Sequence, residues 1–492
     1  MSQSPPPDPS SARLSRRALL RRGLAGAAGG VALGRAPVAS AHATGAGGEP
    51  AAGVPRVIEL HVGDLGPSGA PARVVAPAPL ELVGLGWDAP SRPRLELRAS
   101  RSGGGWGDWA PAGVAHGGTA DSEAKGAAHV GDPVWTGAAR AIEVRAAEPV
   151  LGLRLFGITG ATAAAADAAR RAGAAVASPT GGPIAAGPGQ PSIIPRSAWG
   201  GNHVPPRRRP GYGVVLAVVV HHTEGSNAYG PHESAGQVLS VAQFHRDVKG
   251  WDDIGYNLLV DRYGQIFEGR AGGLEAAVIG AQAGGFNART SGIANLGSFG
   301  AGGQDAAGLR ALVEVLAWKL ALHGVAEPGQ VSVRSDGGPY TAIGAGHHVT
   351  VAPVAGHRDV DQTDCPGDAL YAQLPALRPQ VGARQGTLAR LTLVPATKVA
   401  RRGQPLALTG TLTGQPARGA AASPAPGGVP VAGAPIEVRE LGVHGGRVLA
   451  RTTTGPTGVW QAPVVLHRET VLVAVHRQRP GASSGGIVLP VR

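Results

Sequence analysis

Hydrophobic and polar residues alternate in short runs over two separate regions of the chain. In residues 55–158, runs such as 57–62 and 151–155 alternate and are separated by turns rich in Gly and Pro. Strict alternation is typical of strands with one buried face. It predicts an antiparallel β-sandwich for residues 55–158. The same pattern over residues 387–492 predicts a second sandwich, of the immunoglobulin-like kind.

The region between them, residues 191–378, has a mixed pattern. Residues 214–220 form a continuous apolar run, as expected for a strand that is buried on both faces. Residues 234–248 and 305–323 repeat apolar side chains every three or four positions, which predicts amphipathic helices. A hairpin is expected around residues 261–264. We therefore predict an α/β domain with a mixed sheet and flanking helices.

Glycine and proline mark the connections between these domains. The chain of 492 residues contains 79 Gly and 42 Pro, and many of them gather between the regions of regular pattern. Residues 159–190 are expected to form a flexible linker, with room for a short Ala-rich helix near residues 163–175. A break is expected over residues 379–386, because Pro and Gly interrupt the pattern there.

The first residues of the chain resemble an export signal. Arg16 and Arg17 form a twin-arginine pair, a weakly apolar stretch follows over residues 23–33, and residues 41–43 offer a small-x-small cleavage pattern. We expect residues 1–43 to be a removable signal of the twin-arginine type. The mature protein would then be secreted or associated with the cell wall, without stable membrane insertion.

Charge and cysteine content narrow the functional classes. The formal net charge is +12 and the sequence pI is near 10.7, which would suit nucleic acid, a polyanionic wall or a membrane surface. The sequence contains no groove-reading motif and no RNA-binding aromatic pattern, so nucleic acid is not expected as a partner. Cys365 is the single cysteine, which excludes an intramolecular disulfide.

The middle region contains residues of two types suited to zinc, histidine and cysteine. His221 and His222 follow the predicted buried strand, and His357 and Cys365 lie close together further along the chain. Two imidazoles and one thiolate are a sufficient protein ligand set for a catalytic zinc, which keeps a fourth position open. Spacing alone is weak evidence, because the chain contains 16 His. Neighbours on a strand point to opposite faces, so we favour His221 over His222 as the ligand.

Several short motifs of the middle region occur in the order found in one known family. The region resembles the zinc-dependent N-acetylmuramoyl-L-alanine amidases, which include the T7-lysozyme-like enzymes and the peptidoglycan recognition proteins. The matching motifs are IPRSAW at residues 194–199, VVHHT at 219–223, GWDDIGYN at 250–257, GQIFEGR at 264–270, GFN at 285–287, GHRD at 356–359 and TDCPG at 363–367.

The resemblance implies a ligand set and two catalytic side chains. The family's zinc ligands fall on His221, His357 and Cys365, so Zn²⁺ is the expected cofactor. Tyr256 matches the tyrosine that orients the zinc-bound water, and Thr363 matches a position that stabilises the oxyanion of the tetrahedral intermediate. The implied reaction is attack of zinc-bound water on the amide between N-acetylmuramic acid and L-alanine of the stem peptide.

Substrate contacts are less well defined by the resemblance. His222, Asn287 and Arg270 are the residues expected to bind substrate, and peptidoglycan is the expected partner; no protein partner is indicated. The chain has Gln282 where relatives typically have histidine, and residues 271–277 lack a Gly-Trp pair that accompanies diaminopimelate preference in some relatives. Stem-peptide preference therefore stays open. The alternative function is a recognition protein that binds peptidoglycan without cleaving it.

Overall fold

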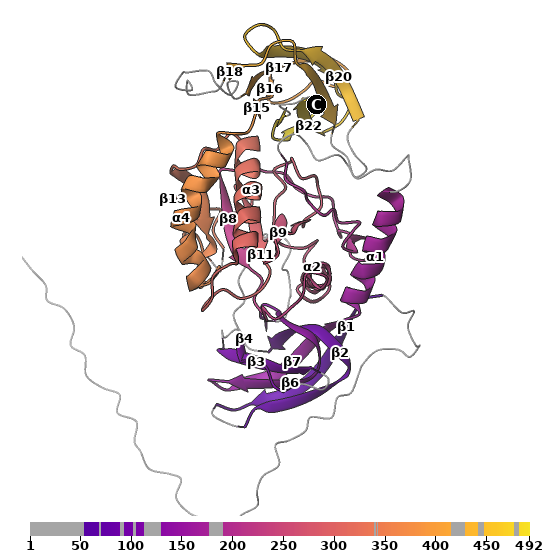
Figure 1. Cartoon of the computed structure of the whole chain (residues 1–492), viewed down its shortest axis with the longest axis vertical. Coiled ribbons are helices and arrows are strands. Elements are labelled where there is room, and N and C mark those ends of the chain that lie inside the picture. The colour runs from indigo at the N-terminus through magenta and orange to yellow at the C-terminus, as the bar shows by residue number, and fades with distance from the viewer. Residues whose placement is uncertain are drawn as a thin grey trace, which may run out of the picture. The chain divides into compact units, whose positions relative to one another are not determined.

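We describe the protein from a computed structural model (Figure 1). The structure describes residues 54–67, 70–88, 93–101, 105–112, 129–176, 190–338, 341, 343–414, 429–440, 447–476 and 482–492. The predicted export signal, residues 1–43, lies outside the described residues. Among the helices that are described, none is both long and apolar enough to cross a membrane.

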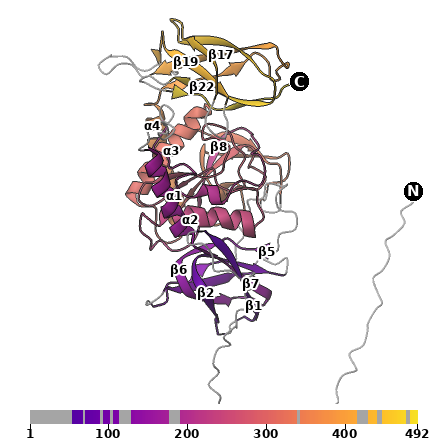
Figure 2. The same cartoon turned by 90° about the vertical axis from the view of Figure 1, so that its right-hand side faces the viewer.

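The N-terminal β domain consists of antiparallel strands that wrap around one core (Figure 2). The sheet has seven strands in the order β1-β7-β2-β6-β3-β4, with β5 paired to β2. Buried residues from β1, β2, β3, β6 and β7 form a single cluster. The strands are β1 (Arg56–Leu65), β2 (Ala72–Trp87), β3 (Leu95–Arg101), β4 (Ala110–Pro111), β5 (His129–Val130), β6 (Val134–Ala146) and β7 (Val150–Thr159).

The strands and their antiparallel pairing agree with the sequence prediction, but the expected two layers are parts of one continuous sheet. The reason is the length of β2, which spans 16 residues and pairs with both β6 and β7. Register shifts around Leu80 interrupt its pairing with β6. Such irregularities let a long strand bend, so one sheet covers both sides of the core.

The first part of the predicted linker is ordered and packed. Helix α1 (Ala161–Val176), expected near residues 163–175, carries four buried alanines, at positions 161, 164, 165 and 168. The first three of them belong to a core cluster shared with the next domain. Glu81 of β2 accepts hydrogen bonds from the backbone N–H groups of Ala161 and Thr162, the donors that a helix start leaves unpaired. This part of the predicted linker is therefore not flexible, whereas residues 177–189 lie outside the described residues.

The central domain, residues 190–385, is built on a five-stranded mixed sheet. The strand order is β10-β9-β11-β8-β14, in which β9, β11, β8 and β14 run parallel and β10 is antiparallel to β9. The strands are β8 (Ala217–His222), β9 (Leu258–Val260), β10 (Ile266–Glu268), β11 (Thr290–Asn295) and β14 (Val354–Gly356). The predicted mixed sheet and hairpin are confirmed, and the buried strand begins three residues later than expected.

Helices cover this sheet as the sequence predicts (Figure 1). Helix α3 (Ala306–Leu322) starts after Asp305 and ends before Gly324, whose φ of +71° favours glycine. Helix α2 (Ser234–Gln243) is continued by a wider π-type turn, η2 (Phe244–Val248), so the predicted helix 234–248 has two parts.

Helix α4 (Asp368–Gln385) runs through the expected break. Pro375 and Pro379 lie inside it and share its exposed face, because they are four residues apart. The opposite face buries Leu370, Leu374, Leu377 and Val381 against the core of the central domain. This packing stabilises the helix although proline lacks an N–H donor. The prediction of a break at Pro379 is therefore wrong.

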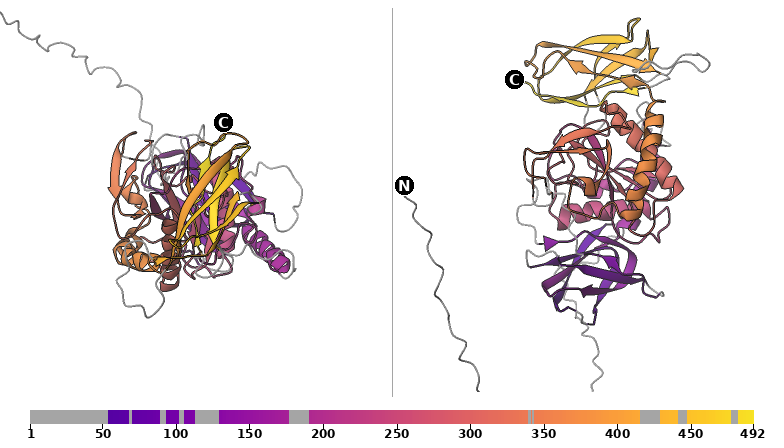
Figure 3. Two further views of the ribbon diagram at one scale, coloured as in Figure 1. Left: turned by 90° about the horizontal axis from the view of Figure 1, so that it is seen from above. Right: turned by 90° about the vertical axis from the view of Figure 1, so that its left-hand side faces the viewer.

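From Arg390 to the last residue, the described parts of the chain form two small sheets around a shared core (Figure 3). Strand β17 (Pro405–Gly414) pairs with β15 (Arg390–Leu391), β16 (Val394–Pro395), β18 (Val429–Pro430) and β21 (Val459–Val465). The other sheet contains β19 (Pro435–Glu440), β20 (Arg447–Thr453), β22 (Thr470–His476), β23 (Ala482–Ser483) and β24 (Ile487–Leu489). Two layers around one core are as predicted, whereas the immunoglobulin-like topology stays a prediction.

Candidate metal centre

The candidate centre lies where β8 and β14 end. His221 and His222 are the last two residues of β8, His357 follows β14 directly, and Cys365 lies in the loop before α4. Because β8 and β14 pair in parallel, His221 at the end of β8 and His357 after β14 lie at the same edge of the sheet. One nitrogen each from His221 and His357 and the Cys365 sulfur lie within 4.8 Å of one another, and all three residues are buried.

A chain of hydrogen bonds fixes the orientation of the His221 ring. Its Nε2 lies 2.5 Å from Oε1 of Gln282. The Gln282 amide nitrogen donates to Thr290 Oγ1, and the Thr290 hydroxyl donates to the carbonyl of Phe286. Because the amide nitrogen is used in this way, the amide oxygen faces His221 and accepts from Nε2–H. The lone pair on Nδ1 is then directed to the Cys365 sulfur, 3.7 Å away.

A buried carboxyl group fixes the orientation of the His357 ring, as Gln282 does for His221. Nε2 of His357 lies 2.8 Å from Oδ2 of Asp361, and the same oxygen accepts a hydrogen bond from the backbone of Gly284. Burial raises the pKa of the Asp361 carboxyl to about 7. An acceptor on Nε2 leaves Nδ1 as the nitrogen that a metal would take. Sequence reasoning missed both Gln282 and Asp361 as partners of the ligands; only the departure at position 282 drew attention to one of them.

The loop around Cys365 is held from two sides. The backbone N–H of His222 donates to the Cys365 sulfur at 3.4 Å, and the N–H of Cys365 donates to Thr363 Oγ1 at 3.1 Å. Burial raises the pKa of the Cys365 thiol well above its usual value. A thiolate at this position therefore requires a cation beside it.

The three donors fit a zinc ion. Ligand bonds of about 2.0–2.3 Å in a tetrahedron place neighbouring donor atoms about 3.5 Å apart. The distance of 3.7 Å between His221 Nδ1 and Cys365 Sγ is close to that value. Two imidazoles and one thiolate are also a donor set that zinc prefers, and three protein ligands leave one position open.

Tyr256 lies beside this centre and belongs to a group of packed rings that also contains His245 and Trp251. Nothing in the sequence indicated that these two residues lie near Tyr256. The Tyr256 and His221 ring centroids are 5.3 Å apart. On its other side Tyr256 contacts His245, which in turn packs against Trp251. Burial raises the pKa of the Tyr256 phenol well above its usual value. Burial also lowers the pKa of His245 to about 3, so that imidazole is neutral.

The residues predicted to bind substrate are all buried and bonded within the protein. His222 Nε2 lies 2.7 Å from Oε1 of Glu224. The Asn287 side-chain oxygen accepts from the backbone of Gln282 and of the next residue. Arg270 is 8% exposed and donates to the carbonyl of Ile254. These contacts shape the walls of the centre.

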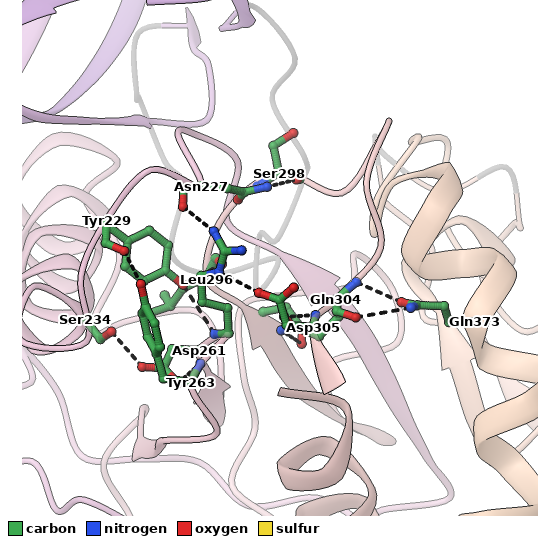
Figure 4. A network of polar contacts seen from close by, with 12 residues as sticks. Asn227, Tyr229, Ser234, Asp261, Tyr263, Leu296, Ser298, Gln304, Asp305 and Gln373 are labelled. Atoms are coloured by element: carbon green, nitrogen blue, oxygen red, sulfur yellow. Dashed lines mark hydrogen bonds and ion pairs between the residues drawn. The ribbon is translucent and has the colours of Figure 1, made fainter. Parts of the chain in front are cut away.

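Loops next to the centre are tied to the β9–β10 hairpin by a polar network (Figure 4). Arg262 donates to the carbonyl of Asn227 and to Asp305, and Asp261 accepts from Ser234. The Tyr229 hydroxyl donates to the carbonyl of Leu296, the residue after β11. The segments that follow β8 and β11 are therefore held by the hairpin, which makes the sheet edge a rigid base for the centre.

Two pairs of neighbouring residues lie near the centre. Of the first pair, Arg358 forms an ion pair with Asp368, and Asp359 accepts a hydrogen bond from the Tyr371 hydroxyl. The second pair, His347 and His348, is exposed at the start of β13 (His348–Val351), which pairs with β12 (Val331–Arg334).

Comparison with family models gives two matches. Residues 211–368 match a model described as N-acetylmuramoyl-L-alanine amidase. Residues 37–179 match a model described as an N-terminal galactose-binding domain-like domain. The amidase match contains all three candidate ligands together with Tyr256 and Thr363, and the second match contains every strand of the N-terminal β domain.

Curated proteins give matches to the central domain. Peptidoglycan recognition protein 1 of Bos indicus is 32% identical over 183 residues, which are 37% of this chain and 80% of that protein. N-acetylmuramoyl-L-alanine amidase of Sus scrofa is 31% identical over 193 residues, 38% of this chain but 27% of that protein. A crystal structure of peptidoglycan recognition protein-LE in complex with tracheal cytotoxin is 26% identical, with a TM-score of 0.29, and the match covers 37% of this chain and 92% of that one.

Proposed function

Because this chain belongs to the family of peptidoglycan recognition proteins and related amidases, we propose that it is a zinc-dependent N-acetylmuramoyl-L-alanine amidase. It would cleave the amide between N-acetylmuramic acid and the L-alanine of the stem peptide. The observation that carries the proposal is the complete donor set, His221, His357 and Cys365, gathered within 4.8 Å. A recognition protein that only binds peptidoglycan has no use for three buried donors arranged in this way.

In this proposal the metal ligands and their hydrogen-bond partners have different roles. Zn²⁺ held by the three donors supplies Lewis acidity for the scissile carbonyl and for water. Gln282 and Asp361 hold the two imidazoles in the tautomer that directs Nδ1 inwards. Fixed ligands need no rearrangement during the reaction, which is the advantage of a site built on strand ends.

Tyr256 and Thr363 would act on the reacting groups. The raised pKa of Tyr256 keeps its phenol protonated, so it can orient water by a hydrogen bond. Thr363 accepts a hydrogen bond from Cys365 N–H, so its own O–H remains available and would donate a hydrogen bond to the oxyanion that forms when the carbonyl is attacked. The C–N bond would then break, with water supplying its OH to the carbonyl carbon and its proton to the nitrogen, and the stem peptide would leave with L-alanine at its amino end.

Export and wall attachment are parts of the same proposal. The twin-arginine pattern at Arg16 and Arg17 motivates export in a folded state, with residues 1–43 removed. The positive net charge of +12 favours a polyanionic wall. Protein sequencing of the mature N-terminus from a secreting culture tests this part, and a mature protein that begins at Met1 would contradict it.

Cleavage of purified peptidoglycan tests the activity. Mass analysis after incubation should show free stem peptides that begin with L-alanine, and prior treatment with a chelator should remove them. Peptidoglycan that is bound but yields no free stem peptide would favour the recognition function instead.

Removal of one donor tests the centre itself. Cys365→Ala should lose zinc, measured as metal per chain, and lower the rate of amide hydrolysis at least about a hundredfold, because two imidazoles alone hold the metal weakly. The matched control is His347→Ala, which changes an exposed histidine of the β12–β13 insert and should keep one zinc per chain. A Cys365→Ala protein that is active and free of zinc would refute the assignment.

A further inference from the structure

An ion pair at the edge of the N-terminal β domain reaches into the central domain. Asp132 lies in the turn between β5 and β6, and its carboxylate pairs with the ammonium of Lys249, which follows η2. The side chains are 13% and 7% exposed. Two charges this well removed from water hold each other in place, because each would be unfavourable alone.

This ion pair is the first of a series of side-chain contacts that ends at the candidate centre. Lys249 Nζ lies over the Trp251 ring, 5.0 Å from its centroid. The ring centroids of Trp251 and His245 are 4.5 Å apart, and those of His245 and Tyr256 are 5.6 Å apart. Tyr256 then contacts His221. Each member packs against the next, so a displacement of Lys249 is passed on to the Tyr256 phenol.

The backbone around these rings leaves them little freedom. The N–H of Gly255 donates to Nδ1 of His245, and the N–H of Trp251 donates to the carbonyl of the same histidine. His245 and Trp251 are 3% and 5% exposed. The Lys249 ammonium and the His245 ring are therefore two of the contacts that hold the Trp251 ring, beside the backbone at Gly255.

We propose that Asp132, supplied by the N-terminal β domain, is a positioning residue for the hydrolytic centre. It holds Lys249 over Trp251, and the stack of Trp251 and His245 sets the orientation of Tyr256 beside His221. The inference rests on the proposed amidase function, and it makes the N-terminal β domain a part of the catalytic unit. Without the carboxylate, the Lys249 ammonium turns to water and the Trp251 ring loses its cover.

The same interface offers a matched control. Gln243 is also nearly buried and donates across the interface to the carbonyl of Pro55, but none of its described contacts is with the ring stack. Loss of that hydrogen bond weakens the domain contact without touching Trp251. A role of Asp132 in domain attachment alone therefore predicts the same outcome for Asp132→Asn and Gln243→Leu, whereas the positioning role predicts different ones.

Kinetics of the full-length chain on a soluble muropeptide separate the two roles. Asp132→Asn should lower kcat about tenfold with KM within about twofold, since misplacement of a water-orienting group affects the chemical step. Zinc content should stay at one per chain. Gln243→Leu should keep the kcat of the unchanged protein, and Asp132→Glu, which retains the carboxylate, should recover most of the loss. Equal kcat values for Asp132→Asn and Gln243→Leu overturn the proposal.

A measurement that needs no activity tests the same point. The ¹H–¹³C NMR signal of the His245 ring senses the ring current of Trp251, so it should shift in Asp132→Asn and stay in place in Gln243→Leu. An unshifted His245 signal in Asp132→Asn overturns the positioning role even if kcat falls. If the unchanged protein hydrolyses no muropeptide, the amidase proposal fails, and the NMR signal still decides whether Asp132 controls the stack.

Discussion

The two β-rich ends of the chain are attached to the central domain in different ways. The N-terminal β domain shares a core with it: Leu82, Trp135 and Ile158 belong to the same buried cluster as Phe244 of the central domain. Gly84 is so close to the Phe244 ring that a Cβ there would lie 2.1 Å from it. At the C-terminal end the described residues make a smaller contact: Val471 packs with Ala276 and Val278, and the backbone N–H groups of Gly485 and Gly486 donate to the central domain.

The difference teaches that similar sequence patterns do not imply similar roles. Both ends show the same alternation of apolar and polar residues, and both were expected to be separate sandwiches. An alternating strand says which face is buried, but not whether the buried partner belongs to the same domain. We infer that the N-terminal β domain and the central domain form one folding unit, to which the C-terminal domain is added.

Deletion of each end should give the largest contrast. A chain without residues 54–176 exposes the core around Phe244 and should fail to fold, measured by solubility and far-ultraviolet circular dichroism. A chain cut after Gln385, where α4 ends, loses a small contact and should stay folded with bound zinc. A soluble, helical protein without residues 54–176 would contradict the single folding unit.

Two valines offer a matched comparison at smaller scale. Val130 lies at the N-terminal interface and Val471 at the C-terminal one, with exposed fractions of 8% and 9%. Each Val→Ala change should lower the free energy of unfolding by about 1–2 kcal/mol. Val130→Ala should lower the temperature of the unfolding transition in which zinc is released. Val471→Ala should lower only the transition temperature of the C-terminal domain. Differential scanning calorimetry with zinc release followed in parallel distinguishes these outcomes.

Acid should lower the free energy of unfolding through His245, which packs on the ring stack beside the N-terminal interface; this is the smallest of the three effects. The folded protein protonates His245 only near pH 3, whereas an unfolded chain does so near pH 6.5. Between these values the unfolded state binds more protons, so stability falls as the pH is lowered from about 6.5 towards 3. His245→Gln should show a weaker dependence in denaturant titrations across this range, and an unchanged slope would argue against a buried neutral His245.

The sequence predicted the sheet and helices of the central domain because local pattern and tertiary role agree there. The apolar run before His221 became strand β8, and the apolar residues spaced three or four apart became helix α3. The predicted turn ends at Gly264, whose φ is positive. The prediction failed at Pro379, since tertiary packing of Leu377 and Val381 outweighs the preference of proline to end a helix. At α1 the Ala-rich helix is confirmed but the flexibility of the linker is not, because a sequence of small residues does not show which partner surface it packs against.

At the centre, motif order indicated the three donors but not what holds them. Nothing local identifies Gln282 or Asp361 as a partner of a ligand, because a hydrogen bond to a ring nitrogen depends on where two distant segments meet. Asp132 is harder still to predict, since it lies in another domain, 117 residues from Lys249 along the chain. Such contacts are decided by tertiary geometry, which spacing along the chain does not encode.

The solitary thiol of Cys365 makes the protein its own reporter. With one cysteine in 492 residues, any thiol-selective reagent labels this position alone. The side chain is 1% exposed, so labelling requires a local opening of the loop before α4. The alkylation rate of Cys365 therefore reports how often that loop opens. A ligand that stabilises the closed loop lowers this rate, and no engineered label is needed to measure it.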